Sequence, residues 1–130
     1  MRQEANNWLR QEKADFKTAN DCLEDGNYYA SAFFCQQTIE KCLKGIYIVR
    51  KISTPPKTHN LLELSLKPNI PEEFLNVVRE LTPEFIITKY PDAIGGIPAD
   101  LYDKEKSHRI LEITREFFEW MMELEDLKGL

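Results

Sequence analysis

Two long stretches with helical periodicity, separated by only a few residues, constrain the fold of this chain more than any other feature. In the first stretch, about residues 2–24, apolar side chains recur at the three- and four-residue spacing of one helix face. These side chains are Ala5, Trp8, Leu9, Phe16, Ala19 and Leu23. The second stretch begins just after Asn27, a residue suited to capping a helix N-terminus, and extends to about Lys51. Asp25-Gly26-Asn27 is a short helix stop, so we expect an antiparallel helical hairpin.

Prolines divide the middle of the chain into shorter elements. Residues 53–57 contain two adjacent prolines and are predicted to be non-helical. A short third helix is expected within residues 58–67. Pro71 suits the first turn of a fourth helix, which Pro83 should kink or divide, with Thr82 capping the second piece.

The last part of the chain is predicted to be one loop and one long helix. Residues 89–98 hold two prolines and two glycines, and form the longest predicted loop. The last helix is expected from Tyr102 or Asp103 to about Leu127. No strand-type alternation, repeat or linker interrupts this pattern. The sequence therefore predicts an all-α, up-and-down four-helix bundle with one additional short helix, as a single domain over residues 1–130.

Composition excludes several classes of function. The formal net charge of −5 argues against a broad nucleic-acid-binding surface, although it leaves a local basic pocket open. The three cysteines have neither disulfide-framework nor zinc spacing, so we expect free thiols, no metal and no cofactor. No signal peptide is visible, and no window approaches the ~20 apolar residues of a membrane span. A cytoplasmic location without membrane contact is expected.

A polar strip runs through the middle of the second predicted helix. Gln36, Glu40 and Lys44 follow one another at four-residue spacing, as do Gln37 and Lys41. Side chains four residues apart are neighbours on a helix. Because bulky apolar residues crowd both sides of the strip, its amides, carboxylate and amines lie beside the core and need partners. On the first helix, two carboxylates at the edge of the apolar stripe are interpreted as boundary residues within reach of a base on another helix. They are Glu12 and Asp15.

Several short pieces of the sequence carry a resemblance to a known family. They are Trp8 with Ala14-Asp15 and Ala19, the run Gly26 to Phe34, Gln36-Gln37 with Glu40-Lys41 and Leu43-Lys44, Thr58-His59-Asn60-Leu61 with Leu64, and Lys89-Tyr90-Pro91-Asp92 with Tyr102. In this order and spacing, over nearly the whole chain, they resemble the HEPN domain family (higher eukaryotes and prokaryotes nucleotide-binding).

The resemblance implies a bundle of about five helices, paired as a homodimer, that acts with a minimal nucleotidyltransferase partner in a toxin–antitoxin or nucleotide-modifying pair. Some family members are ribonucleases whose signature has an arginine and a histidine separated by four to six residues, the first of them polar. Here that position falls on Ile52, Ser53 or Thr54 before His59, and on residues 101–103 before His108. Our first interpretation is therefore a nucleotide-binding or regulatory subunit. The alternatives are a degenerate ribonuclease toxin, which leaves enzymatic activity open, and a non-catalytic dimerisation module.

The residues themselves suggest how a nucleotide or RNA ligand would be bound. Three lysines and His59 would meet phosphate charge, Glu40 would orient the lysines, Gln37 would pair with a base edge, and Tyr47 or Tyr90 would stack on the base. The predicted ligand-binding set is Gln37, Glu40, Lys41, Lys44, His59, Lys89, Tyr90 and Asp92. The alternative is a purely structural polar network that links the second helix to the loops. It would consist of Gln37, Glu40, Lys44, His59 and Asp92.

Overall fold

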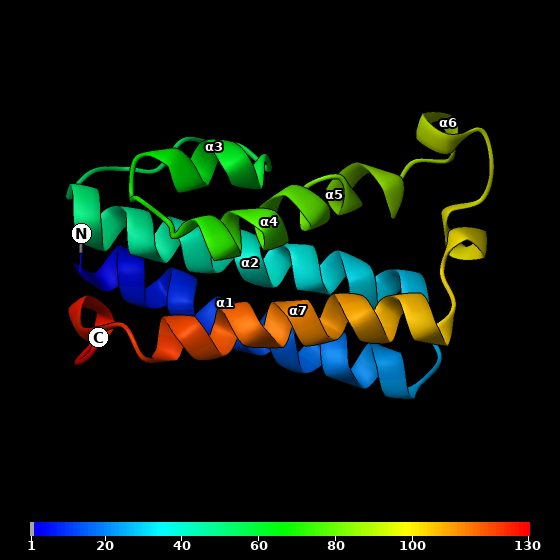
Figure 1. Cartoon of the computed structure of the whole chain (residues 1–130), viewed down its shortest axis with the longest axis horizontal. Coiled ribbons are helices and arrows are strands. Elements are labelled where there is room, and N and C mark those ends of the chain that lie inside the picture. Colours follow the sequence, from blue (N-terminus) through cyan, green and yellow to red (C-terminus); the bar gives the residue numbers. More distant parts are fainter. Residues whose placement is uncertain (1) are drawn as a thin grey trace.

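A helical hairpin forms the centre of the computed structural model, which describes residues 2–130. Helix α1 (Arg2–Glu24) and helix α2 (Tyr28–Lys51) lie antiparallel and make the largest helix–helix contact in the molecule, as predicted (Figure 1). Gly26 adopts a positive φ of 80° in the connection, a conformation that glycine adopts without strain. The Asn27 side chain makes no capping hydrogen bond, contrary to expectation. Ser31 Oγ instead ties the start of α2 to Ala19 O at 2.9 Å.

The two hairpin helices approach closely at Gly45. A Cβ atom at this position would lie 2.7 Å from Cδ2 of Leu9, well inside van der Waals contact. The absent side chain therefore lets α1 pack directly against the backbone of α2. This close approach places α1 against the C-terminal half of α2.

Helix α7 (Lys104–Met122) is another long helix of the bundle and packs against both α2 and α1. Asp103 caps it by accepting a hydrogen bond from Lys106 N at 2.8 Å. The helix ends five residues before the expected Leu127, because Leu124 is extended and the chain folds back. A 3₁₀ turn, η2 (Glu125–Leu127), follows and brings Asp126 to Arg50 of α2.

Short helices cover the remaining side of α2. They are α3 (Leu61–Leu66), α4 (Glu72–Leu81) and α5 (Glu84–Ile87). Pro83 divides α4 from α5 as predicted, but Thr82 does not cap the second piece. Its Oγ1 accepts a hydrogen bond from Leu61 N at 2.9 Å, because α3 packs beside it. Asn60 caps α3 by accepting from Leu62 N and Glu63 N.

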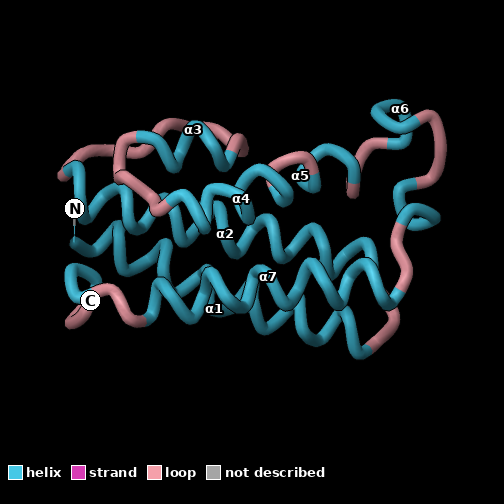
Figure 2. Tube along the Cα trace, viewed as in Figure 1, coloured by secondary structure: helices cyan, strands magenta, loops and turns pink. Residues whose placement is uncertain are grey.

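The segment predicted as one irregular loop, together with the three residues after it, contains two helical turns. They are α6 (Pro91–Ile94) and the 3₁₀ turn η1 (Pro98–Leu101), both started by a proline. Figure 1 places α6 at the end of the bundle away from the two termini, and Figure 2 shows that loops join only helices in the described chain. The all-α bundle with additional short helices is confirmed. No helix in residues 2–130 combines the length and apolarity needed to cross a membrane.

The hydrophobic core lies where α1, α2, α3, α4 and α7 meet. It includes Phe117, Ile39, Leu43, Ile46, Leu61, Leu64, Leu81 and Ile110. Cys35 and Cys42 are buried free thiols of α2, whereas Cys22 of α1 is half-buried. Within the described residues, no group of three or more His, Cys, Asp or Glu side chains is placed to hold a metal ion.

Candidate functional site

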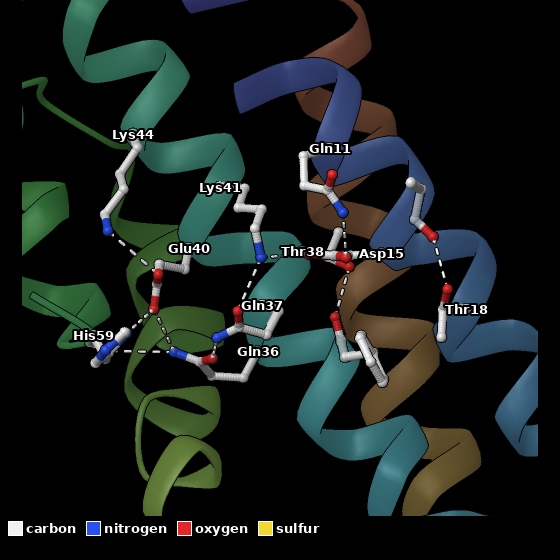
Figure 3. A network of polar contacts seen from close by, with 12 residues as sticks. Gln11, Asp15, Thr18, Gln36, Gln37, Thr38, Glu40, Lys41, Lys44 and His59 are labelled. Atoms are coloured by element: carbon white, nitrogen blue, oxygen red, sulfur yellow. Dashed lines mark hydrogen bonds and ion pairs between the residues drawn. The ribbon is translucent and has the colours of Figure 1, made fainter. Parts of the chain in front are cut away.

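The polar strip on α2 has a buried carboxylate, Glu40, at its centre (Figure 3). Its Oε2 lies 3.3 Å from Nζ of Lys44, and its Oε1 accepts from Nδ1 of His59 at 2.8 Å and from Nε2 of Gln36 at 3.4 Å. Lys44 and Gln36 are also buried. The negative charge of Glu40 is thus shared by two basic groups and an amide. These contacts explain how the polar side chains are tolerated beside the core.

The other half of the strip reaches across to α1. Lys41 Nζ donates to Oδ2 of Asp15 at 2.5 Å and to Oε1 of Gln37 at 2.9 Å, while Gln11 donates to the other oxygen of Asp15 at 3.0 Å. Gln37 in turn donates to the amide oxygen of Gln36 at 2.8 Å. A continuous chain of polar contacts therefore runs from α1 to the loop before α3. Asp15 does meet a base from another helix, as its position indicated.

Glu12, the other α1 carboxylate expected at the edge of the apolar stripe, is not a boundary residue. Its side chain is completely buried, and neither carboxylate oxygen has a hydrogen-bond partner among the described residues. Burial raises the pKa of Glu12 to about 8, with a smaller upward contribution from Asp15 that Lys13 opposes. The helical wheel placed Glu12 at the edge of the stripe, but the close packing of α1 on α2 carries it inside.

His59 is held from two sides. Its ring stacks on Phe85 with centroids 3.8 Å apart and an interplanar angle of 13°, and its Nδ1 faces Glu40. Gln36 Nε2 also donates to the His59 carbonyl at 3.2 Å. Because these contacts fix both the backbone and the ring, the imidazole is held rigidly although 54% of its side chain is exposed. Its Nε2 makes no hydrogen bond within residues 2–130.

The three predicted residues from the segment after α5 are placed differently. Lys89 Nζ lies 4.5 Å from the centroid of Phe85 and 4.9 Å from that of Phe33, so Lys89 and His59 both contact Phe85. Tyr90 and Asp92 are exposed at the α6 end of the bundle. Within the described chain, neither has a hydrogen bond or ion pair with the polar strip. The structural network that was the alternative interpretation therefore forms without Asp92.

A cleft of about 410 Å³ opens beside Lys44 and His59, between the N-terminal part of α1 and the loop before α3. It is lined by Glu4, Trp8, Lys44, Ile48, Thr54, Pro55, Pro56, Lys57, Thr58 and His59. Lys44 Nζ lies 4.9 Å from the Trp8 ring centroid, a cation–π contact. The cleft thus combines an aromatic ring and apolar walls with three basic side chains, in a volume within the usual range for small-ligand sites.

Sequence reasoning missed two residues of this cleft. Trp8 was noted only for its helical spacing and within the resemblance, and Lys57 only beside two prolines. Tyr47, proposed to stack on a base, is buried and 5% exposed, so it is not available. The aromatic group at the cleft is Trp8 instead. In the sequence, Trp8 lies one helical turn before the polar residues of α1, and this spacing could have indicated a site residue. Only the position of the proline-containing loop shows that Trp8 lines a cleft.

Comparison with known proteins identifies the family. The sequence model of the HEPN domain matches residues 5–125. The chain belongs to the HEPN domain family. The crystal structure of TT1696 from Thermus thermophilus superposes with a TM-score of 0.81 at 26% identity, over 92% of this chain and 96% of that one. The structure of ST0689, described as an archaeal HEPN homologue, gives a TM-score of 0.76 at 24% identity, over 91% and 94% of the two chains. No significant match was found among curated proteins.

In this HEPN domain, the two halves of the polar strip have different surroundings. Lys41 and Gln37 complete an ion-paired bridge between α1 and α2 and do not line the cleft. Lys44 and His59 meet at Glu40 and also line the cleft. The arrangement can present positive charge beside an aromatic ring, which suits an anion that carries a flat apolar group.

Proposed function

We propose that this HEPN domain binds a nucleotide in the cleft of Trp8, Lys44, Lys57 and His59, as a binding or regulatory subunit. The observation that carries the proposal is the meeting of an aromatic ring with basic side chains in one cleft, in a protein whose net charge is −5. A local concentration of positive charge against that background favours a phosphate-bearing ligand.

The division of roles within the cleft follows from exposure. Lys57 is exposed and has no ion pair within the described residues, so it is the lysine most able to meet a phosphate. Lys44 is buried and shared between Glu40 and the Trp8 ring, and it contributes a fixed positive charge. Trp8 is half-buried, and its ring supplies a surface on which a base stacks, at about 1–3 kcal/mol per base.

Calorimetric titration against a panel of nucleoside monophosphates tests the proposal. We expect binding by the wild-type protein and about tenfold weaker binding by Lys57→Ala, which loses one charge-assisted hydrogen bond. Lys67→Ala is the matched control, since Lys67 is also exposed but lies after α3, outside the cleft. Absence of binding across the panel, or equal weakening by both variants, would refute the site.

The wider role that we propose is a homodimer acting with a nucleotidyltransferase partner, in a toxin–antitoxin type of pair. Family membership supports it, together with exposed apolar side chains on α5, on the turns after it and at the start of α2. These are Tyr29, Ile86, Tyr90, Ile97 and Leu101. Light scattering on the purified chain tests the dimer, and co-purification with the product of the adjacent gene tests the pair. A monomer that retains no partner would contradict both.

The ribonuclease alternative has less support. Arg50, the arginine nearest in sequence to His59, bonds Asp126 and the Pro68 carbonyl, away from the histidine. His108 lies exposed on α7, 3.9 Å from Glu112. Cleavage of RNA by the wild type and its loss in His59→Ala would restore that alternative.

A further inference from the structure

The proposed nucleotide site contains a histidine in a single defined orientation. An ionised carboxylate only accepts hydrogen bonds, so the Glu40 contact at 2.8 Å places a proton on Nδ1 of His59. The stacked Phe85 ring fixes the plane of the imidazole. The remaining nitrogen, Nε2, is therefore an acceptor when the ring is neutral and a donor when it is protonated. An unprotonated phosphate oxygen, itself an acceptor, pairs only with the protonated form.

Among the groups around His59, the imidazole itself is the one that can gain positive charge when an anion binds. From α2, Glu40 faces the ring and already pairs with Lys44. The loop before α3 contributes Lys57 to the same cleft, and α1 contributes Glu4. Lys89 contacts the same Phe85 ring, with its Nζ 4.5 Å from the ring centroid. Lys44 is already paired with Glu40, whereas Lys57 has no ion pair in the described chain, so protonation of His59 adds a second positive charge that a phosphate can meet.

We infer that a nucleotide phosphate binds this cleft together with a proton, which His59 takes up. This inference rests on the proposed nucleotide site and adds its regulation. In the bound state, the imidazolium lies between two acceptors, with Nδ1–H donating to Glu40 and Nε2–H donating to the phosphate. Imidazole is the side chain whose charge ordinarily changes between pH 5 and 8. Because binding takes up one proton, we expect affinity to fall as pH rises, by at most about tenfold per pH unit.

Proton NMR of the imidazole rings tests the inference without a substitution at the site. The chain has two histidines, and His108 on α7 is an internal reference. The Hε1 resonances are followed from pH 5 to 9, without and with saturating AMP, and are assigned with His108→Gln. We expect AMP to move the titration midpoint of His59 upward by at least about one pH unit and to leave that of His108 in place.

Each outcome supports or overturns a different part of the inference. Binding of AMP with an unchanged His59 midpoint would overturn the proton coupling and leave the nucleotide site standing. Failure of AMP and the other monophosphates to bind would overturn the site and the coupling with it. A shift of equal size at both histidines would show a general charge effect and also contradict the inference.

Calorimetry on variants gives an independent readout. AMP affinity is measured at pH 6, 7 and 8 for the wild type, His59→Gln and His108→Gln. Proton uptake by the AMP phosphate itself is common to all three proteins and cancels in the comparison. The wild type and His108→Gln should show the same steep dependence on pH, and His59→Gln a shallower one. Parallel profiles for all three proteins would contradict the coupling.

Discussion

Replacing Glu12 by glutamine should change how the stability of this domain depends on pH. The wild-type carboxyl is completely buried without a hydrogen-bond partner in the described chain, and burial raises its pKa from 4.5 to about 8. Between these values the folded protein keeps the proton and the unfolded chain loses it. The free energy of unfolding therefore falls as pH rises from 4.5 to 8, and this contribution is fully lost above pH 8.

The size of the effect follows from the same shift. Each pH unit is worth about 1.4 kcal/mol, so the full interval amounts to about 5 kcal/mol. Glutamine matches the shape of the neutral carboxyl and does not titrate. Glu12→Gln should thus be close to the wild type near pH 4.5 and more stable by several kcal/mol at pH 9. For a domain that unfolds with a typical value of roughly 5–15 kcal/mol, this difference is large.

Urea unfolding followed by far-UV circular dichroism, at intervals from pH 5 to 9, measures the difference. Glu24→Gln is the matched control, because it removes the same charge from an exposed position on the same helix. The gap between Glu12→Gln and the wild type should widen steadily with pH, while Glu24→Gln should run parallel to the wild type. A constant gap for Glu12→Gln would refute the reasoning, because it would mean that this carboxyl ionises normally in the folded protein.

Three further substitutions or reactions test the packing. Asp15→Asn removes the partner of Lys41 from a largely buried ion pair, and should lower the free energy of unfolding by about 2 kcal/mol in urea; a loss below about 0.5 kcal/mol would contradict a structural role for the pair. Gly45→Val should lower the melting temperature, since overpacking against Leu9 costs about 1–3 kcal/mol, whereas a rise would show that α1 does not approach so closely. Cys22 alone should react with Ellman's reagent in the native protein. The other two thiols are buried, and burial raises their pKa well above that of a free thiol. Rapid reaction of two thiols in the native protein would contradict the burial of Cys35 and Cys42 in the core.

The long helices were predictable because their signals are local. Apolar spacing and the Asp25-Gly26-Asn27 connection suffice for the hairpin, and Pro83 suffices to divide α4 from α5. The errors arose where a tertiary contact outweighed a local preference. Thr82 bonds α3 instead of capping α5, and Glu12 is carried into the core by a neighbouring helix.

The candidate site was predictable only in part. Glu40, Lys44 and His59 come together as proposed. Glu40 and Lys44 are one helical turn apart on α2, and the segment after the two prolines brings His59 to them. Trp8 and Lys57 reach the same cleft from two segments far apart in the sequence, and nothing local to either stretch shows that they meet. The packing of α1 on α2 decides which polar residues face a cleft and which bridge two helices.

Localising a bound nucleotide tests the central claim most directly. The chain has two tryptophans, Trp8 at the cleft and Trp120 packed against Phe74 and Phe117 at the core. In a ¹⁵N-labelled sample titrated with AMP, we predict that the indole resonance of Trp8 and the backbone resonances of Lys57 and His59 move together with one dissociation constant, while the indole of Trp120 stays in place. Saturable shifts elsewhere with an unmoved Trp8, or no shifts at millimolar AMP, would contradict a nucleotide site in this cleft.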